Sequence, residues 1–194
     1  CRERLPDAPE LLWHDSQAAD AAEDLLRAAD LAVDAALGFV RIGSIDDAEN
    51  AILRVLECED RAVIGRLVRS LPSLVSRKRG REVLDLALEL GTTTFEALGL
   101  HAELADALQA VLLKHGDDPS LRTLFVSALA ASLGGERAVR GLLDRSGLTD
   151  PAVPFPDALD RYSDLAVYLP GTHVLNADWG VGRVTGHDGE FLSI

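Results

Sequence analysis

Residues 113–129 read LKHGDDPSLRTLFVSAL, and this stretch carries the clearest signals for how the chain folds. Gly116 fits the end of a helix, because glycine readily adopts the left-handed conformation of a C-terminal cap. Asp118 followed by Pro119 fits the start of the next helix, since aspartate caps free amide groups and proline suits the first turn. The stretch therefore predicts two helices joined by a tight turn.

The same start and stop signals recur on both sides of this turn. Between them, apolar residues repeat at three- and four-residue spacing, as expected for helices with one buried face. Ser44 and Asp47 resemble a capping box, which marks another helix start. The first predicted helix begins at Asp15 and passes through Leu31, and the second begins at Ser44. The next two run from Asp60 to Pro72 and over Arg81–Leu90, where Gly91 is the stop. Two more span His101–His115 and Ser120–Leu133, and the last follows a Gly134-Gly135 break and ends at Gly147.

Short helices with tight connections predict antiparallel hairpins that stack side by side. Such an array is typical of tetratricopeptide and HEAT repeats, and residues 113–129 resemble the junction between two tetratricopeptide-like units. No strict 34-residue period can be aligned along the chain, so an irregular helical bundle stays open as the alternative. The predicted fold class is mainly α, with the helical array over residues 1–147.

The composition changes after Gly147. Four prolines interrupt residues 148–170, which are predicted to form a joint that holds one short helix, Asp157–Tyr168. Beyond the joint the pattern turns to short strands, with Asp188-Gly189 as a typical hairpin turn. Because two or three strands do not make a stable sheet alone, residues 171–194 are expected to be the start of a small, truncated β module. Its strands are predicted at Thr172–Asn176, Val181–His187 and Glu190–Ile194.

The most specific motif is PGTHVLNADWGVGRVTGHDGEFLSI, residues 170–194. It places Trp179 beside two glycines, which allow a bulge or a close approach of the backbone. The segment resembles the first strands of Tudor-like or SH3-like barrels in bacterial transcription proteins, among them the CarD family and the polymerase-interacting domain of the transcription-repair coupling factor. Residues 171–174 match a G-D-x-V step, with Thr172 in place of the acidic residue, and residues 180–184 match a G-[VI]-G-[RK]-[VI] step.

The order of the parts resembles large proteins in which a helical-repeat region and a W-G-[FV]-G-x-[VI] module precede a Gre-type transcript-cleavage domain. The sequence contains no coiled-coil hairpin with an acidic tip, so the resemblance implies no cleavage-stimulating activity for this chain. It implies a non-catalytic region of a cytoplasmic, bacterial transcription elongation protein that binds RNA polymerase or another protein partner. Trp179, Val181 and Arg183 are the residues expected to dock on that partner.

The charge of the chain is distributed unevenly. Its formal net charge is −13, yet residues 61–81 contain basic side chains and no acidic one. This basic island consists of Arg61, Arg66, Arg69, Arg77, Lys78, Arg79 and Arg81. The favoured interpretation is a solvated helical face that balances acidic neighbours; phosphate or an acidic partner surface is the alternative. The island has no aromatic residue to stack on bases, which argues against single-stranded nucleic acid. If the island binds a partner, the expected binding patch is Arg66, Arg69, Arg77, Lys78, Arg79 and Arg81.

No catalytic or metal-binding pattern is present in the sequence. The five histidines are scattered, without the spacing that places two on one helix face. Two cysteines, Cys1 and Cys58, are too few for a disulfide framework and fit a reducing cytoplasm. No phosphate-binding loop, nucleophile elbow or HExxH motif occurs, and no stretch reaches the ~20 apolar residues of a membrane span. We therefore expect no enzyme activity, no cofactor and no membrane contact. A helical-repeat scaffold unrelated to transcription and a non-catalytic fragment of a larger enzyme stay open as alternatives.

Overall fold

A computed structural model describes residues 8–75, 79–167, 169, 171–178, 180–187 and 192–193. Over these residues the chain is mainly helical and finishes in short antiparallel strands, so the predicted fold class is confirmed. It divides into two compact units, Cys1–Val111 and Leu112–Ile194.

The described residues form nine helices and four short strands. The helices are α1 (Pro9–Ala21), α2 (Leu25–Ile42), α3 (Ile45–Leu56), α4 (Arg61–Leu74), α5 (Gly80–Ala97), α6 (His101–His115), α7 (Pro119–Ser132), α8 (Glu136–Ser146) and α9 (Phe155–Ala166). The strands are β1 (His173–Asn176), β2 (Gly180–Arg183), β3 (Gly186–His187) and β4 (Leu192–Ser193).

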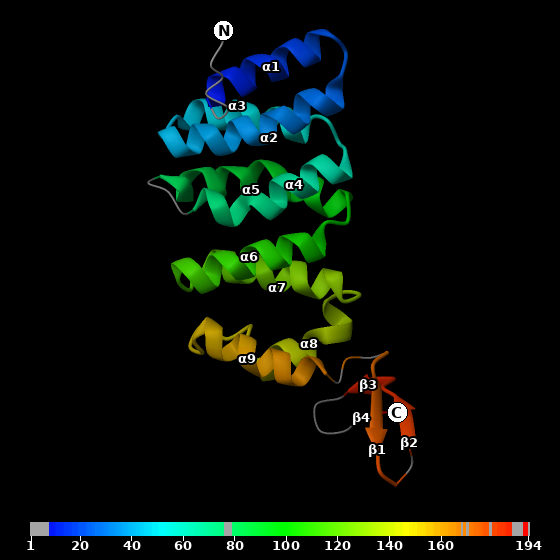
Figure 1. Cartoon of the computed structure of the whole chain (residues 1–194). Helices are drawn as coiled ribbons and strands as arrows, with labels where there is room; N and C mark the ends of the chain where they lie inside the picture. Colours follow the sequence, from blue (N-terminus) through cyan, green and yellow to red (C-terminus); the bar gives the residue numbers. More distant parts are fainter. Residues whose placement is uncertain are drawn as a thin grey trace. The chain divides into compact units, whose positions relative to one another are not determined.

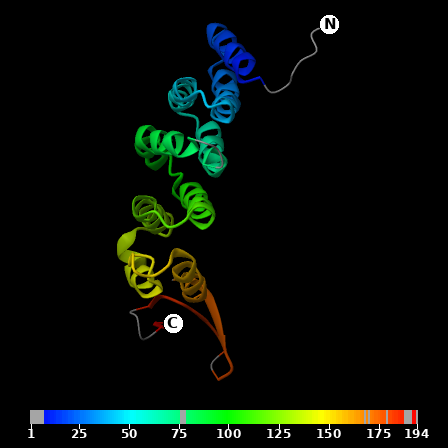
Figure 2. The same cartoon turned by 90° about the vertical axis from the view of Figure 1, so that its left-hand side faces the viewer.

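Helices of the first unit stack in two columns (Figure 1). α2 packs against α4 in one column, and α3 packs against α5 in the other. In Figure 2 the helices of both columns are viewed nearly along their axes. The two columns also contact each other, α2 with α3 and α4 with α5, while α1 packs on α2. This unit therefore contains the side-by-side helical hairpins that the short, tightly connected helices predict.

Small side chains make α2 the centre of the first unit. Its fully buried alanines are Ala28, Ala29, Ala32, Ala35 and Ala36. At Gly38 the approach of α1 is closer still, because a Cβ atom there would lie 2.6 Å from the Cβ of Pro9. Neighbouring helices can come this near only where side chains are small, so the small residues of α2 determine how closely its neighbouring helices approach it.

The start of the array differs from the sequence prediction. One helix was predicted from Asp15 through Leu31, but the chain turns at Ala22–Asp24 and begins a second helix. Glu23 adopts a left-handed conformation with a φ of 61°, and the Asp24 side chain accepts a hydrogen bond from the Arg27 amide at 3.3 Å. The prediction was wrong because a left-handed residue is usually glycine, and a glutamate gives no such signal.

Two predicted helix ends are also wrong. Pro72 does not end α4, which continues to Leu74 with the proline inside it. Gly91 does not end α5, which continues to Ala97. By contrast, Asp60 does cap α4, since its carboxylate accepts the amides of Ala62 and Val63 at 2.9 and 3.0 Å. The predicted capping box at Ser44 is not formed, because the Ser44 hydroxyl donates to the Asp47 carboxylate and makes no cap hydrogen bond to the first turn of α3.

The turn between α6 and α7 is the one that the sequence marks most clearly. α6 spans the predicted residues, and the Asp118 carboxylate accepts the amides of Ser120 and Leu121 at 2.9 and 3.0 Å. The predicted cap is therefore confirmed.

Replacing this cap tests its contribution to stability. We expect Asp118→Ala to lower the free energy of unfolding by about 1 kcal/mol, because two amides of the first turn lose their acceptor. Urea denaturation followed by circular dichroism measures the change. Ser120 is exposed and lies two residues after Asp118, so Ser120→Ala should change the free energy of unfolding by less than about 0.5 kcal/mol. Equal effects of the two substitutions would contradict the capping role.

In the second unit, α8 packs against α7 and α9. The Phe125 and Phe155 rings meet edge to face with centroids 5.3 Å apart, and the Phe155 side chain is fully buried. Gly147, where the sequence predicts the end of the array, is buried and lies between α8 and α9. Within the predicted joint, Leu148, Phe155 and Ala158 are buried, while residues 149–152 are exposed. The joint's helix is α9, which begins two residues before the predicted Asp157.

The strands form two short antiparallel pairs, β1 with β2 and β3 with β4. The predicted strand Val181–His187 is divided into β2 and β3. Gly180 opens β2 with a φ of 81°, a conformation that glycine adopts without strain. The predicted Asp188-Gly189 turn lies outside the described residues.

Candidate interaction surfaces

The two sides of the β1–β2 hairpin differ in exposure, because Val174 and Gly182 on one side are partly buried and the side chains on the other are exposed. Its register pairs His173 with Arg183, Val174 with Gly182 and Leu175 with Val181. Because side chains alternate along a strand, His173, Leu175, Val181 and Arg183 share one side. We call these four residues the open face.

Exposure distinguishes the two sides clearly. On the open face, Leu175 is 81% exposed and Val181 is 69% exposed. On the other side Val184 is 1% exposed, and its amide donates to the Thr172 carbonyl at 2.8 Å. The Thr172 hydroxyl in turn donates to the carbonyls of Val167 and Leu169 at 3.0 and 2.8 Å. The hairpin is thus tied to the chain before it while two large apolar side chains remain in solvent.

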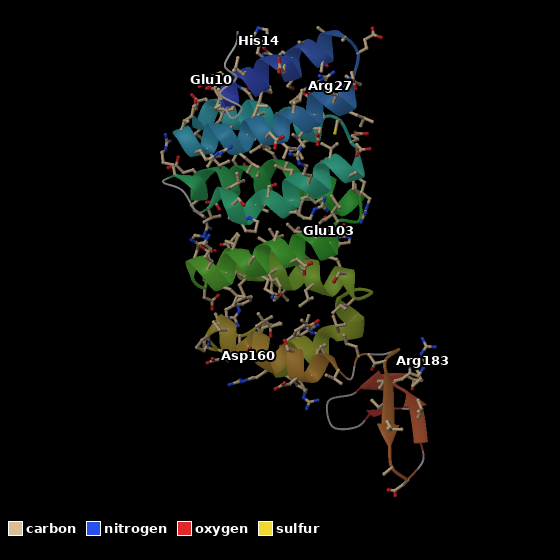
Figure 3. The ribbon with its side chains drawn as sticks, viewed as in Figure 1. Glu10, His14, Arg27, Glu103, Asp160 and Arg183 are labelled. Atoms are coloured by element: carbon tan, nitrogen blue, oxygen red, sulfur yellow. The ribbon has the colours of Figure 1, made fainter. Side chains whose placement is uncertain are left out.

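Two of the three predicted docking residues fall on this open face. Val181 lies directly opposite Leu175, and Arg183 lies opposite His173 at the other end of the pair. Figure 3 shows the labelled Arg183 side chain extending from the edge of the hairpin. Trp179, the third predicted residue, lies outside the described residues. Sequence reasoning missed Leu175 and His173, although the spacing of the turn would have paired them with β2.

The basic island is largely engaged with acidic side chains of the chain itself. The Arg66 guanidinium donates to the Asp30 carboxylate at 2.6 Å and also to Asp34, both on α2. The hydrogen bond to Asp34 is the main cause that raises the pKa of Arg66 above its ordinary value. Arg66 therefore links α4 to α2 within the first unit.

Other arginines of the island are paired in the same way. Arg61 contacts Glu103 at 3.1 Å, and Arg81 contacts Asp85 at 2.8 Å. Arg79 donates to Glu82 at 2.7 Å, and this hydrogen bond holds the pKa of the Glu82 carboxyl below its ordinary value. These pairs agree with the interpretation that the island balances acidic neighbours.

Two members of the predicted patch, Arg77 and Lys78, lie outside the described residues. Among the described cations of the island, Arg69 is exposed and makes no ion pair. Of the four described members of the patch, Arg66, Arg79 and Arg81 are thus ion-paired within the chain. Binding of the patch to phosphate or to an acidic partner stays a prediction.

Two further findings concern chemistry and membranes. In the part of the chain that the structure describes, no three His, Cys, Asp or Glu side chains gather into a group that could hold a metal ion. The described helices include none that is both long enough and apolar enough to cross a bilayer.

Comparisons of the chain with protein-family models, with curated proteins and with solved structures return no match. The resemblance to Gre-type and CarD-type proteins therefore rests on residues 170–194 and on the order of the parts. It enters the function below as a proposal.

Proposed function

We propose that this chain is a non-catalytic, protein-binding region of a bacterial transcription elongation protein, which docks on RNA polymerase in the cytoplasm through the open face of the β1–β2 hairpin. The observation that carries the proposal is the exposed apolar pair Leu175 and Val181 on adjacent strands. The choice of RNA polymerase comes from the motif resemblance of residues 171–174 and 180–184.

The open face has the composition of a small binding site. Burying a leucine or valine side chain contributes about 1.5–3 kcal/mol, so this pair can act as the apolar centre of an interface. His173 and Arg183 flank the pair and can form the polar rim. A two-stranded hairpin with one side in solvent is only marginally stable alone, which favours a further surface against it.

The test measures binding of the full chain to purified bacterial RNA polymerase by biolayer interferometry. We expect Val181→Asp to weaken binding at least tenfold, because a carboxylate in an apolar contact must be desolvated without a partner. Since Val181 is exposed in the free chain, the variant should keep its fold, and an unchanged melting temperature would verify this.

Leu113→Asp is the matched control, because Leu113 is also a large apolar residue that is half exposed, but it lies on α6. We expect this control to bind like the wild type. Absence of binding by the wild-type chain would overturn the link to polymerase and leave the helical-repeat scaffold as the function. Binding that Val181→Asp and Leu113→Asp reduce equally would overturn the open face as the docking site.

A further inference from the structure

A groove lies between α1 and α3 in the first unit. Its volume is about 530 Å³, and it is lined by Trp13, Ser16, Gln17 and Asp20 of α1, by Asn50, Leu53 and Arg54 of α3, and by Glu57, which directly follows α3. Each helix contributes residues at positions i, i+3, i+4 and i+7, which form a single stripe along one helix face. We call this feature the α1–α3 groove.

The two stripes lack the composition of a packed helix seam. α3 packs on α5, and α1 packs on α2, but α1 and α3 form no comparable seam within the described residues. Most of the groove residues are polar, and Gln17 and Asn50 are exposed. Polar stripes that face a gap stay hydrated or bind a polar ligand, since an apolar helix partner would leave their amides without hydrogen bonds.

An ion-pair network lies at one end of the groove. Arg54 on α3 pairs with Asp20 on α1 and donates to Glu57 at 3.1 Å. One guanidinium is thus shared by two carboxylates, and the side chains of Asp20 and Glu57 remain 44% and 64% exposed. With two acids and one base, the lining carries a net negative charge, so this end attracts a cation.

The remaining lining suits a peptide main chain. The amides of Gln17 and Asn50 each offer donors and an acceptor, which match the alternating groups of an extended backbone. Trp13 and Leu53 add apolar surface, and Leu53 is 38% exposed. Ser16 forms part of the floor, because its buried hydroxyl is used to donate to the Ala28 carbonyl at 2.7 Å.

The length of the groove fits a short segment. Seven residue steps from Trp13 to Asp20 span about 10 Å of helix, and an extended chain covers about 3.3–3.6 Å per residue. About three residues of an extended peptide would therefore lie along the groove.

We propose that the α1–α3 groove binds an extended segment of a protein partner that carries a lysine or arginine. The cation lies at Asp20 and Glu57, and the backbone of the segment bonds to Gln17 and Asn50. The groove and the open face consist of different residues, and this proposal does not depend on which protein binds the open face.

The experiment uses the full chain with Trp179→Phe, which leaves Trp13 as the single tryptophan. The probes are acetylated, amidated pentapeptides whose central residue is lysine, norleucine or glutamate and whose neighbours vary. We expect lysine-centred peptides to shift the Trp13 fluorescence and to bind at least tenfold more tightly than their glutamate counterparts. Absence of any Trp13 response to the library, or equal binding of lysine and glutamate peptides, would overturn the proposal.

Two variants separate the parts of the site. Asp20→Asn together with Glu57→Gln should remove most of the preference for lysine, and Asn50→Ala should weaken all peptides about equally. The matched control is Glu89→Gln, an exposed acid of α5 that does not line the groove, and it should leave binding unchanged. A preference for lysine that survives the double substitution would contradict the role of the two carboxylates. Circular dichroism verifies that each variant is folded, since loss of exposed ion pairs has a small effect on stability.

Discussion

An Arg122→Ala variant is expected to lose about 3–5 kcal/mol of its free energy of unfolding, the largest effect of any single substitution considered for this chain. Arg122 is 4% exposed and lies on α7, inside the second unit. Its guanidinium donates to the carbonyls of Leu148, Gly147 and Val153 at 2.9, 2.6 and 2.7 Å. One side chain thus binds three carbonyls of the connection from α8 to α9.

The charge of Arg122 is balanced as well as buried. Its guanidinium pairs with the Asp117 carboxylate at 2.6 Å and lies 5.8 Å from the centre of the Phe155 ring. Truncation to alanine would remove the Arg122 donor from the Asp117 carboxylate and from the Leu148 and Val153 carbonyls, while the Gly147 carbonyl would keep its hydrogen bond from the Asp150 amide at 3.1 Å. Each unpaired buried polar group costs roughly 1–3 kcal/mol, and partial access of water reduces the sum.

Urea denaturation of the full chain measures this effect, and two variants define its cause. Arg122→Met keeps much of the apolar volume but cannot donate, so we expect it to recover little of the loss. Arg140→Ala is the control, because Arg140 is 73% exposed and its contact with Asp144 is 3.9 Å long; we expect a change below about 0.5 kcal/mol. If Arg122→Met proved as stable as the wild type, packing rather than hydrogen bonding would explain the burial of Arg122.

The role of Arg122 illustrates what the sequence could not predict. Within LRTLF, an arginine beside a threonine has the pattern of a solvent-exposed helix position. Its three carbonyl acceptors lie 25 to 31 residues further along the chain, so only the tertiary fold brings them to Arg122. The cap at Asp118, by contrast, uses amides two and three residues away, and the sequence alone predicted it.

The candidate surfaces show the same division between local and distant information. The alternation of the hairpin is visible in the sequence, but both sides carry apolar residues, Val174 and Val184 on one and Leu175 and Val181 on the other. Which side is covered depends on the chain that precedes β1. The two stripes of the α1–α3 groove can each be found at helical spacing, yet they come together only because α1 and α3 both pack on α2.

A Gly91→Ala variant is expected to lose about 2 kcal/mol of its free energy of unfolding, although helix propensity predicts the opposite sign. Alanine is favoured over glycine in a helix interior by about 1 kcal/mol. However, a Cβ atom at position 91 would lie 2.3 Å from the tip of the Phe95 ring, one turn along α5. Phe95 is fully buried, so its ring cannot turn into solvent. Overpacking of a core costs about 1–3 kcal/mol and exceeds the gain in propensity.

Gly141→Ala provides a matched control for this prediction, because Gly141 lies inside α8 and has no atom within 4 Å of a built Cβ. That variant should gain about 0.5–1 kcal/mol, since only propensity acts there. In a Phe95→Leu background, Gly91→Ala should become neutral or stabilising, which a double-mutant cycle in urea would measure. A Gly91→Ala protein that is more stable than the wild type would show that the Phe95 ring moves freely. The expected reversal of sign between two helix-interior glycines follows from one contact: Gly91 reads as a helix stop in the sequence, and it is a glycine because an aromatic ring occupies the place of its side chain.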